Sequence, residues 1–269
     1  MITIFDLLLL IIIKFFKLSL GKPHNTMDRR QMIKASIGTA AMTALGIPLV
    51  AKSVAPTKKI LVIGAHPDDP ETCAGGTMCL LASAGHEVVS VYLTKGQAGI
   101  KGKSHSEAAA IRVKEAMNAC EVMGARSIFM SQIDGGTEIN KDRYLEMKDL
   151  LAKEKPDVVI THWPIDGHRD HAVCGLLVLD AWKRLDRCFK LYYFEPMTGA
   201  QSQLFHPTDW VDISSVVDQK NKACGCHESQ GVDDIMERWH IPMERFRGLE
   251  CRCSYAEAFI HHTVPGSLI

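Results

Sequence analysis

The sequence lacks an excess of charge of either sign. Its 31 lysine and arginine residues balance its 31 aspartate and glutamate residues, and no block of like charge stands out. A protein that binds nucleic acid usually carries a basic patch, because it must neutralise phosphate groups. We therefore expect no nucleic-acid partner and no other polyanionic partner.

Long apolar runs are also missing. A membrane-spanning helix needs about 20 consecutive apolar residues. The stretch from Ile2 to Leu20 is interrupted by Asp6, Lys14 and Lys17, and its longest clean run is Leu7 to Ile13. We expect no stable membrane span in the mature protein.

The two common phosphate-binding motifs are absent as well. Gly75 and Gly76 are adjacent, but they belong neither to a G-x-G-x-x-G pattern nor to a P-loop with its lysine. Nucleotide binding is therefore a weak interpretation of this region.

The cysteines do not form the pattern of a disulfide scaffold. There are nine of them, an odd number, and their spacing is irregular. The close pairs Cys224/Cys226 and Cys251/Cys253 leave open a local disulfide or a second metal site. The plainer alternative is that they are small buried hydrophobic residues.

The N-terminal part of the chain has the layout of an export signal. Arg29 and Arg30 precede Lys34 and an Ala/Gly/Thr-rich run from Ala35 to Ala51, as in a twin-arginine signal peptide. Solvated arginines before a surface helix are the alternative. We expect an exported protein, located in the periplasm or cell envelope.

This interpretation divides the chain into three parts. Because Met27 begins so complete a signal, residues 1–26 are expected to be an upstream mis-start or an extension. Residues 27–55 are then the signal peptide, and residues 56–269 are one catalytic domain.

From Pro56 onward, short apolar runs alternate with longer periodic segments, a pattern typical of α/β proteins. The expected strands are Lys59–Gly64, Glu87–Thr94, Ser127–Met130, Asp157–Thr161 and Leu191–Phe194. The expected helices are Ala74–Ala84, 104–124, Asp142–Lys153, His171–Arg187 and Val216–Ser229. We predict a single Rossmann-like domain with a mostly parallel sheet flanked by helices, whose reactive groups gather at the carboxyl ends of the strands.

The loop after the first expected strand, AHPDDPE over residues 65–71, carries a histidine and two adjacent carboxylates. Its two prolines are expected to stiffen it and keep it out of a helix. His66 and Asp69 are then placed to ligate a cation, and Asp68 is free to act as a base. The plainer alternative is that Asp68 or Asp69 only caps the next helix.

A second constellation, HRDH, also follows an expected strand. His168 and His171 are three residues apart with Asp170 between them, so they can supply a third ligand and an oriented partner. Isolated histidines such as His162 are more often satisfied polar residues than ligands.

These motifs resemble the PIG-L/LmbE family of N-acetylglucosaminyl deacetylases and related amidases, whose loop reads AHPDDE and whose second motif reads HPDH. The resemblance includes LTKGQAG at residues 93–99, which is similar to the family's LTRGEAG, and RVKEA at residues 112–116. It also includes residues 220–230, which fit K-x-x-A-x-x-x-H-x-S-Q. The motifs are spread over nearly all of the chain after Pro56.

The resemblance implies an LmbE-like fold in which His66, Asp69 and His171 bind Zn²⁺ and Asp68 is the general base. Mixed nitrogen and oxygen ligands suit zinc but also admit iron, cobalt or manganese. Such a cation would acidify a water molecule and polarise the carbonyl of an amide, and Asp68 could collect the proton.

Five further residues receive roles from the resemblance. As an imidazolium, His168 would stabilise the oxyanion and protonate the leaving amine, and Asp170 would orient a histidine. Arg112 and Asp134 would contact hydroxyl or carboxylate groups of the substrate, and His227 would line the pocket.

The predicted function is therefore a zinc-dependent hydrolase that removes the N-acetyl or N-acyl group from an N-acetylglucosamine-type amino sugar or its conjugate. The alternative is an amidase that acts on a larger sugar-linked or thiol-conjugate amide. A non-catalytic metal-binding or carbohydrate-binding module is disfavoured, because simple binding needs neither Asp68 nor His168.

The sequence departs from the family pattern at two places. Pro70 is inserted before Glu71, which leaves the bracing role of Glu71 open. Some members carry a catalytic tyrosine two residues before the first histidine of the second motif, where this chain has Asp166. The candidates for a replacement donor are Tyr92, Tyr144 and Tyr255.

Overall fold

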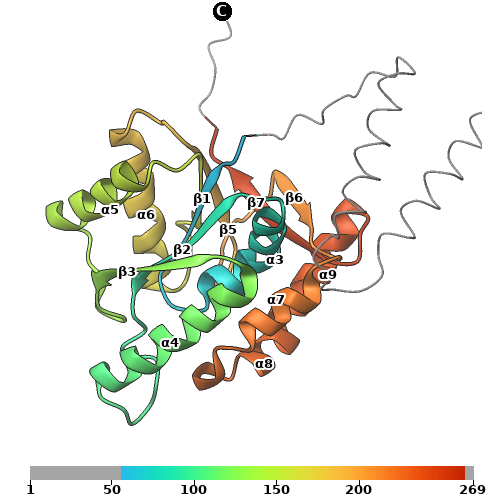
Figure 1. Cartoon of the computed structure of the whole chain (residues 1–269), viewed down its shortest axis with the longest axis horizontal. Helices are drawn as coiled ribbons and strands as arrows, with labels where there is room; N and C mark the ends of the chain where they lie inside the picture. Colours follow the sequence, from blue (N-terminus) through green and yellow to red (C-terminus); the bar gives the residue numbers. More distant parts are fainter. Residues whose placement is uncertain (1–55, 264–269) are drawn as a thin grey trace, which may run out of the picture. The chain divides into compact units, whose positions relative to one another are not determined.

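A seven-stranded sheet lies between two layers of helices in the computed structural model, which describes residues 56–263 (Figure 1). The strand order is β3-β2-β1-β4-β5-β7-β6. Strands β1 to β5 are mutually parallel, whereas β7 is antiparallel to both of its neighbours. The strands are β1 (Lys59–Gly64), β2 (Glu87–Thr94), β3 (Arg126–Gln132), β4 (Val158–His162), β5 (Lys190–Phe194), β6 (Asp209–Asp212) and β7 (Ala256–His261).

The helices cover the two faces of the sheet. They are α3 (Asp69–Ser83), α4 (His105–Met123), α5 (Lys141–Glu154), α6 (Arg169–Arg184), α7 (Val217–Cys224), α8 (Val232–Ile235) and α9 (Ile241–Cys251). A 3₁₀ turn, η1 (Glu228–Gln230), and a π-helical turn, η2 (Met236–His240), join the last three. Helices α5 and α6 pack on one face, and α3, α4 and α7 pack on the other (Figure 1).

Both faces of the central strands are apolar for this reason. In β1, Leu61 and Ile63 point into the α5/α6 layer, while Ile60 and Val62 point into the α3/α4/α7 layer. A continuous β-branched run is what a strand buried on both faces requires. This layering confirms the predicted Rossmann-like, mostly parallel α/β domain.

The five predicted strands are all present, with bounds within two residues of those expected. Strands β6 and β7 and helix α9 were not predicted, and the helix expected over Val216–Ser229 ends at Cys224. The prediction that the prolines keep the first loop out of a helix is wrong. Helix α3 begins at Asp69 with Pro70 in its first turn, where the missing N–H would have no partner within the helix.

The predicted signal peptide and upstream extension, residues 1–55, lie outside the described residues. Within residues 56–263, no helix combines the length and the apolar character needed to cross a membrane.

Candidate metal centre and active site

A pocket of about 360 Å³ opens at the carboxyl ends of the parallel strands, where this fold gathers its reactive groups. The loops after all five parallel strands contribute to it, and the segment from α8 to η2 completes its wall. Its volume lies near the lower end of the range for small-molecule sites, about 300–1,000 Å³. We call it the active-site pocket.

The three predicted metal ligands meet in this pocket. One carboxylate oxygen of Asp69, Oδ2, is 3.4 Å from Nδ1 of His66, and the other, Oδ1, is 3.4 Å from Nε2 of His171. The backbone N–H of His66 also donates to Asp69 Oδ2 at 2.7 Å, which fixes the carboxylate. Asp69 therefore lies between two imidazoles that come from distant parts of the chain.

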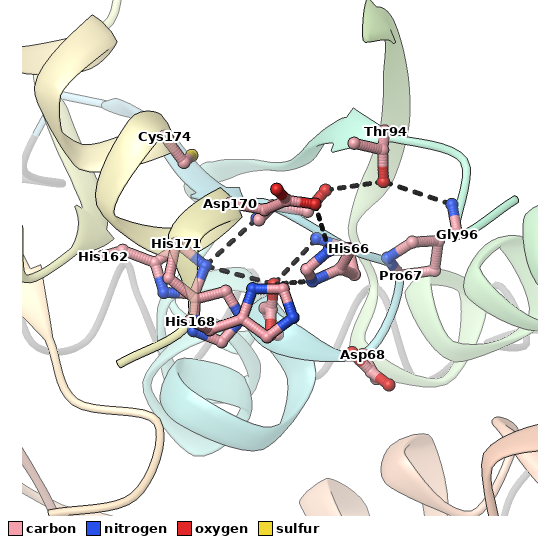
Figure 2. Close-up of polar contacts among 12 residues, drawn as sticks. His66, Pro67, Asp68, Thr94, Gly96, His162, His168, Asp170, His171 and Cys174 are labelled. Atoms are coloured by element: carbon pink, nitrogen blue, oxygen red, sulfur yellow. Dashed lines mark hydrogen bonds and ion pairs between the residues drawn. The ribbon is translucent and has the colours of Figure 1, made fainter. Parts of the chain in front are cut away.

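The outer nitrogen of each imidazole faces another carboxylate. His66 Nε2 is 3.2 Å from Asp170 Oδ2 (Figure 2). His171 Nδ1 is 3.2 Å from Asp166 Oδ1. Asp170 is itself held by the hydroxyl of Thr137 at 2.6 Å and by the N–H of Gly135 at 2.7 Å. Metal-ligating histidines usually donate their second N–H in this way, because the hydrogen bond fixes the tautomer and the ring orientation.

An Asp170→Asn variant is expected to bind its metal about 10–100-fold more weakly, because an amide fixes the tautomer of His66 less firmly than a carboxylate does. Competition with a chelating indicator would measure this affinity. Asp180→Asn, on the same helix α6 but on the surface beside Arg184, is the matched control. Equal affinity in both variants would remove Asp170 from the support of the metal centre.

His162 lies closer to this centre than the sequence indicated. It is fully buried, its ring stacks on His171 with centroids 4.1 Å apart, and its Nε2 is 3.1 Å from Asp69 Oδ2. Burial and the neighbouring His171 lower the pKa of His162 to about 4, so it is neutral. The interpretation of His162 as a satisfied polar residue holds for one ring nitrogen only: Nε2 accepts the N–H of Ala65 at 3.0 Å, whereas Nδ1 has no hydrogen-bond partner within the described residues.

The donor atoms fit a metal ion. Burial opposes protonation of His171, but Asp69 and Asp166 outweigh it and raise its pKa to about 9. The surroundings of this ring therefore favour a positive charge, which a metal ion supplies when it displaces the proton. Three groups of residues each bring ligand atoms within 4.8 Å of one another: His66/His168/His171, Asp69/His162/His171 and His66/Asp134/Asp170. Imidazole and carboxylate donors in this number suit Zn²⁺ and other divalent transition metals.

Asp68 stands to one side of the histidines (Figure 2). It is the N-cap of α3 and has a backbone φ of 111°, a conformation that costs about 1–3 kcal/mol in a residue other than glycine. Burial raises the pKa of Asp68, although the Arg112 guanidinium opposes this shift. A raised pKa suits a general base, because it strengthens the attraction of the carboxylate for a proton.

Arg112 holds this loop in place. Its Nη2 donates to Asp68 Oδ2 at 2.8 Å and to the carbonyl oxygen of Pro67. The guanidinium lines the pocket, where it was predicted to contact substrate, but its hydrogen bonds go to the loop. Gly99 leaves the space that the guanidinium needs, since a Cβ there would clash with Arg112 Nη1.

A Gly99→Ala variant is therefore expected to push the guanidinium away from Asp68 and to lower kcat/KM about tenfold or more with little loss of stability. The small stability cost follows because the clash is with the end of a flexible side chain. Initial rates and thermal unfolding would measure the two effects. Gly225→Ala, which meets no atom closer than 3.4 Å at its Cβ, is the control and is expected to retain full activity.

Glu71 braces the loop that carries Asp68, even though Pro70 is inserted before it. It is fully buried and accepts hydrogen bonds from the N–H of Asp68 at 3.2 Å and from the hydroxyl of Tyr92. Of the three candidate tyrosines, Tyr92 is committed to this contact, and none lines the pocket within the described residues.

His227 was predicted to line the pocket, and this is wrong. It is fully buried outside the pocket lining, with Nε2 3.7 Å from Glu71 Oε2. Burial lowers its pKa and Glu71 raises it, with a net upward shift. His227 is therefore a neighbour of the bracing glutamate.

Asp134 has two roles open to it in this geometry. It lines the pocket, as expected of a substrate contact, but its Oδ1 is also 3.2 Å from His66 Nε2. The backbone N–H of Ala98 donates to its other oxygen at 3.0 Å. Asp134 thus shares the outer nitrogen of His66 with Asp170.

His168 packs against both predicted histidine ligands. Its ring centroid is 4.9 Å from that of His66 and 4.4 Å from that of His171. Burial and these two imidazoles lower the pKa of His168. This lowered pKa favours a neutral ring, which can donate one N–H, over the expected imidazolium.

The cysteine pairs do not join a metal-ligating group within residues 56–263. All nine cysteines are free, and the Sγ atoms of Cys251 and Cys253 lie 3.3 Å apart at the end of α9. Cys224 is fully buried, in agreement with the plainer interpretation as a small hydrophobic residue.

The fold and the site together define a Rossmann-like α/β protein with a buried cluster of histidines and carboxylates at the carboxyl edge of its parallel strands. The family model of PIG-L, the GlcNAc-PI de-N-acetylases, matches residues 61–182, which contain both the HPDD loop and the HRDH motif. The chain belongs to this family.

Relatives with assigned activities include two different reactions. A diacetylchitobiose deacetylase of Thermococcus kodakarensis is 32% identical over 197 residues, which cover 68% of this chain and 73% of that protein. A 4-oxalmesaconate hydratase of Pseudomonas putida is 28% identical over 194 residues, covering 65% of this chain and 75% of that protein. Among solved structures, the N,N'-diacetylchitobiose deacetylase of Pyrococcus horikoshii superposes with a TM-score of 0.68 at 25% identity, covering 90% of this chain and 95% of that one.

Proposed function

We propose that this chain is a metal-dependent hydrolase, with zinc as its ion, that removes the acetyl or acyl group from an N-acylated amino sugar of the N-acetylglucosamine type. The observation that carries the proposal is the meeting of His66, Asp69 and His171 in one pocket that Asp68 also lines. The deacetylase activity of the Thermococcus relative supports the choice of substrate class.

His66, Asp69 and His171 would hold the cation, which would supply a Lewis acid for the amide carbonyl and lower the pKa of a water molecule. Asp68 takes up the proton from the attacking water, because its carboxylate has a raised pKa and lies in the pocket. Arg112 and Glu71 keep Asp68 in position. A neutral His168 donates its N–H to the oxygen on which negative charge develops, an interaction often worth about 3 kcal/mol in the transition state.

The leaving nitrogen needs a proton before it departs as an amine. No tyrosine lines the pocket within the described residues, so the proton taken up by Asp68 is the available source. Asp68 would then act first as base and afterwards as acid, which gives this single carboxyl group both proton transfers.

The test is a screen of the purified protein, loaded with Zn²⁺, against N-acetylglucosamine, its disaccharide and a larger N-acyl glycoside. Acetate release and the appearance of a primary amine would be measured together with metal content. Turnover of only the larger amide would favour the amidase alternative. Addition of water to an unsaturated acid without any amide cleavage would instead place the chain with its hydratase relative and refute the proposal.

A further inference from the structure

His240 is a polar residue in the active-site pocket that the mechanism does not use. It ends the π-helical turn η2 and lines the pocket beside Val232 and Ile235 of α8. The residue is only 3% exposed, and its Nδ1 has no hydrogen-bond partner within the described residues. A buried polar atom without a partner costs free energy, so its presence in a pocket points to a partner that arrives with a ligand.

The backbone around His240 is also unusual. A π-helical turn is rare, and such turns occur frequently at functional sites, because they redirect side chains at the expense of regular hydrogen bonding. Here the turn lies between α8 and α9 and places one imidazole in the lining of the pocket.

The charge state of His240 limits what it can recognise. Burial and the nearby Lys220 lower its pKa to about 3, so the ring is neutral at ordinary pH. Lys220 cannot turn away, because its Nζ is held by Glu244 at 2.7 Å and by Glu257 at 2.6 Å. A neutral imidazole offers one N–H donor and one nitrogen acceptor, which suits a hydroxyl group better than a carboxylate or a phosphate.

The neighbouring wall of the pocket is apolar. Val232, Ile235, Pro196 and Met197 line it together with His240. A surface that combines aliphatic groups with one neutral hydrogen-bonding group matches a pyranose ring, which presents C–H faces and hydroxyl edges.

We propose that His240 is a specificity-determining residue that binds a hydroxyl group of the substrate's sugar ring. This inference rests on the proposed function, because it needs an N-acyl amino sugar at the metal centre. The hydrogen bond from His240 would let the pocket select an N-acyl amino sugar over an amide whose ring carries no hydroxyl groups.

The experiment compares N-acetylglucosamine with N-cyclohexylacetamide, which has the same amide on a ring without hydroxyl groups. His240→Leu is expected to lower kcat/KM for the sugar about tenfold or more, mainly through KM, and to leave the value for the cyclohexyl amide unchanged. His240→Asn or His240→Gln is expected to restore part of the preference, depending on which ring nitrogen binds the hydroxyl. Calorimetry would also measure the binding of glucosamine to the metal-free proteins. This binding is expected to be weaker for His240→Leu than for wild type.

Trp239→Phe is the control for disturbance of η2, since this neighbouring side chain is 47% exposed and is not part of the pocket lining. It is expected to keep the wild-type preference. If wild type cleaves both amides and His240→Leu loses rate equally on both, His240 has only a structural role and the inference is overturned. If wild type cleaves no N-acyl amino sugar, the proposed function itself fails.

Discussion

Asp68→Asn is expected to retain the metal and the fold while kcat falls by about 10²–10⁴-fold, the usual contribution of a general base. The amide cannot accept a proton from water at neutral pH, but its carbonyl oxygen can still accept the hydrogen bond that Arg112 donates to Asp68 Oδ2. The variant therefore removes the proton-accepting function and little else. Turnover and metal content would be measured on the same preparation.

The choice of asparagine matters because of the backbone at this position. Asp68 has a φ of 111°, a region in which asparagine and aspartate are tolerated better than alanine. Asp68→Ala is expected to add a loss of stability to the same loss of turnover, so a comparison of the two separates chemistry from strain. An Asp68→Asn protein with nearly wild-type kcat would contradict the assigned base, and one that lost its metal would show that Asp68 is a ligand.

The sequence predicted the five parallel strands better than the antiparallel end of the sheet, where β7 and β6 lie. Strands such as Lys59–Gly64 are continuous apolar runs because helices cover both of their faces. A short stretch of sequence is therefore enough to recognise them. By contrast, β6 has only four residues, DWVD, with two of them exposed, so it carries almost no apolar pattern. Its pairing with β7 is decided by tertiary contacts that a local window does not contain.

The same reasoning separates the site residues that were predicted from those that were not. His66, Asp69 and His171 stand in compact motifs that follow the neighbouring strands β1 and β4, so strand order brings them together. Asp166 and His240 belong to no motif. The role of Asp166 depends on where the His171 ring lies, and that of His240 depends on a pocket that several segments line. Asp166 could have been found from its position after β4, five residues before a predicted ligand, whereas His240 carried no such signal.

The position of His227 shows the limit of an argument from motifs. A fixed spacing from Lys220 indicated an important residue, but it could not say on which side of the loop the imidazole would lie. The structure places it behind Glu71, where it supports the loop that carries Asp68. Motif membership thus identified the neighbourhood of the active site without distinguishing contact with substrate from support.

His171→Ala is expected to lose both bound metal and activity, with a fall in metal affinity of more than about 100-fold, because two protein ligands hold zinc poorly. The substitution also removes the imidazole that both Asp69 and Asp166 face, although Asp69 keeps its contacts with His66 and His162. A hydrogen bond to a charged group contributes about 1.5–3 kcal/mol, so the metal-free variant, which loses the His171 contacts, should also unfold at a lower temperature than metal-free wild type. Equilibrium dialysis against Zn²⁺ and thermal unfolding would measure the two effects.

His168→Ala is the matched comparison, because it removes an imidazole three residues earlier whose ring stacks on that of His171. If the ligands are His66, Asp69 and His171, this variant keeps its metal and loses only the part of kcat that depends on the oxyanion contact. If the ligands are instead His66, His168 and His171, which also bring their nitrogens within 4.8 Å, both variants lose the metal equally. Full metal content in His171→Ala would exclude both sets of ligands. It would also contradict the proposed mechanism, in which Asp68 acts as a base beside a cation held by these side chains.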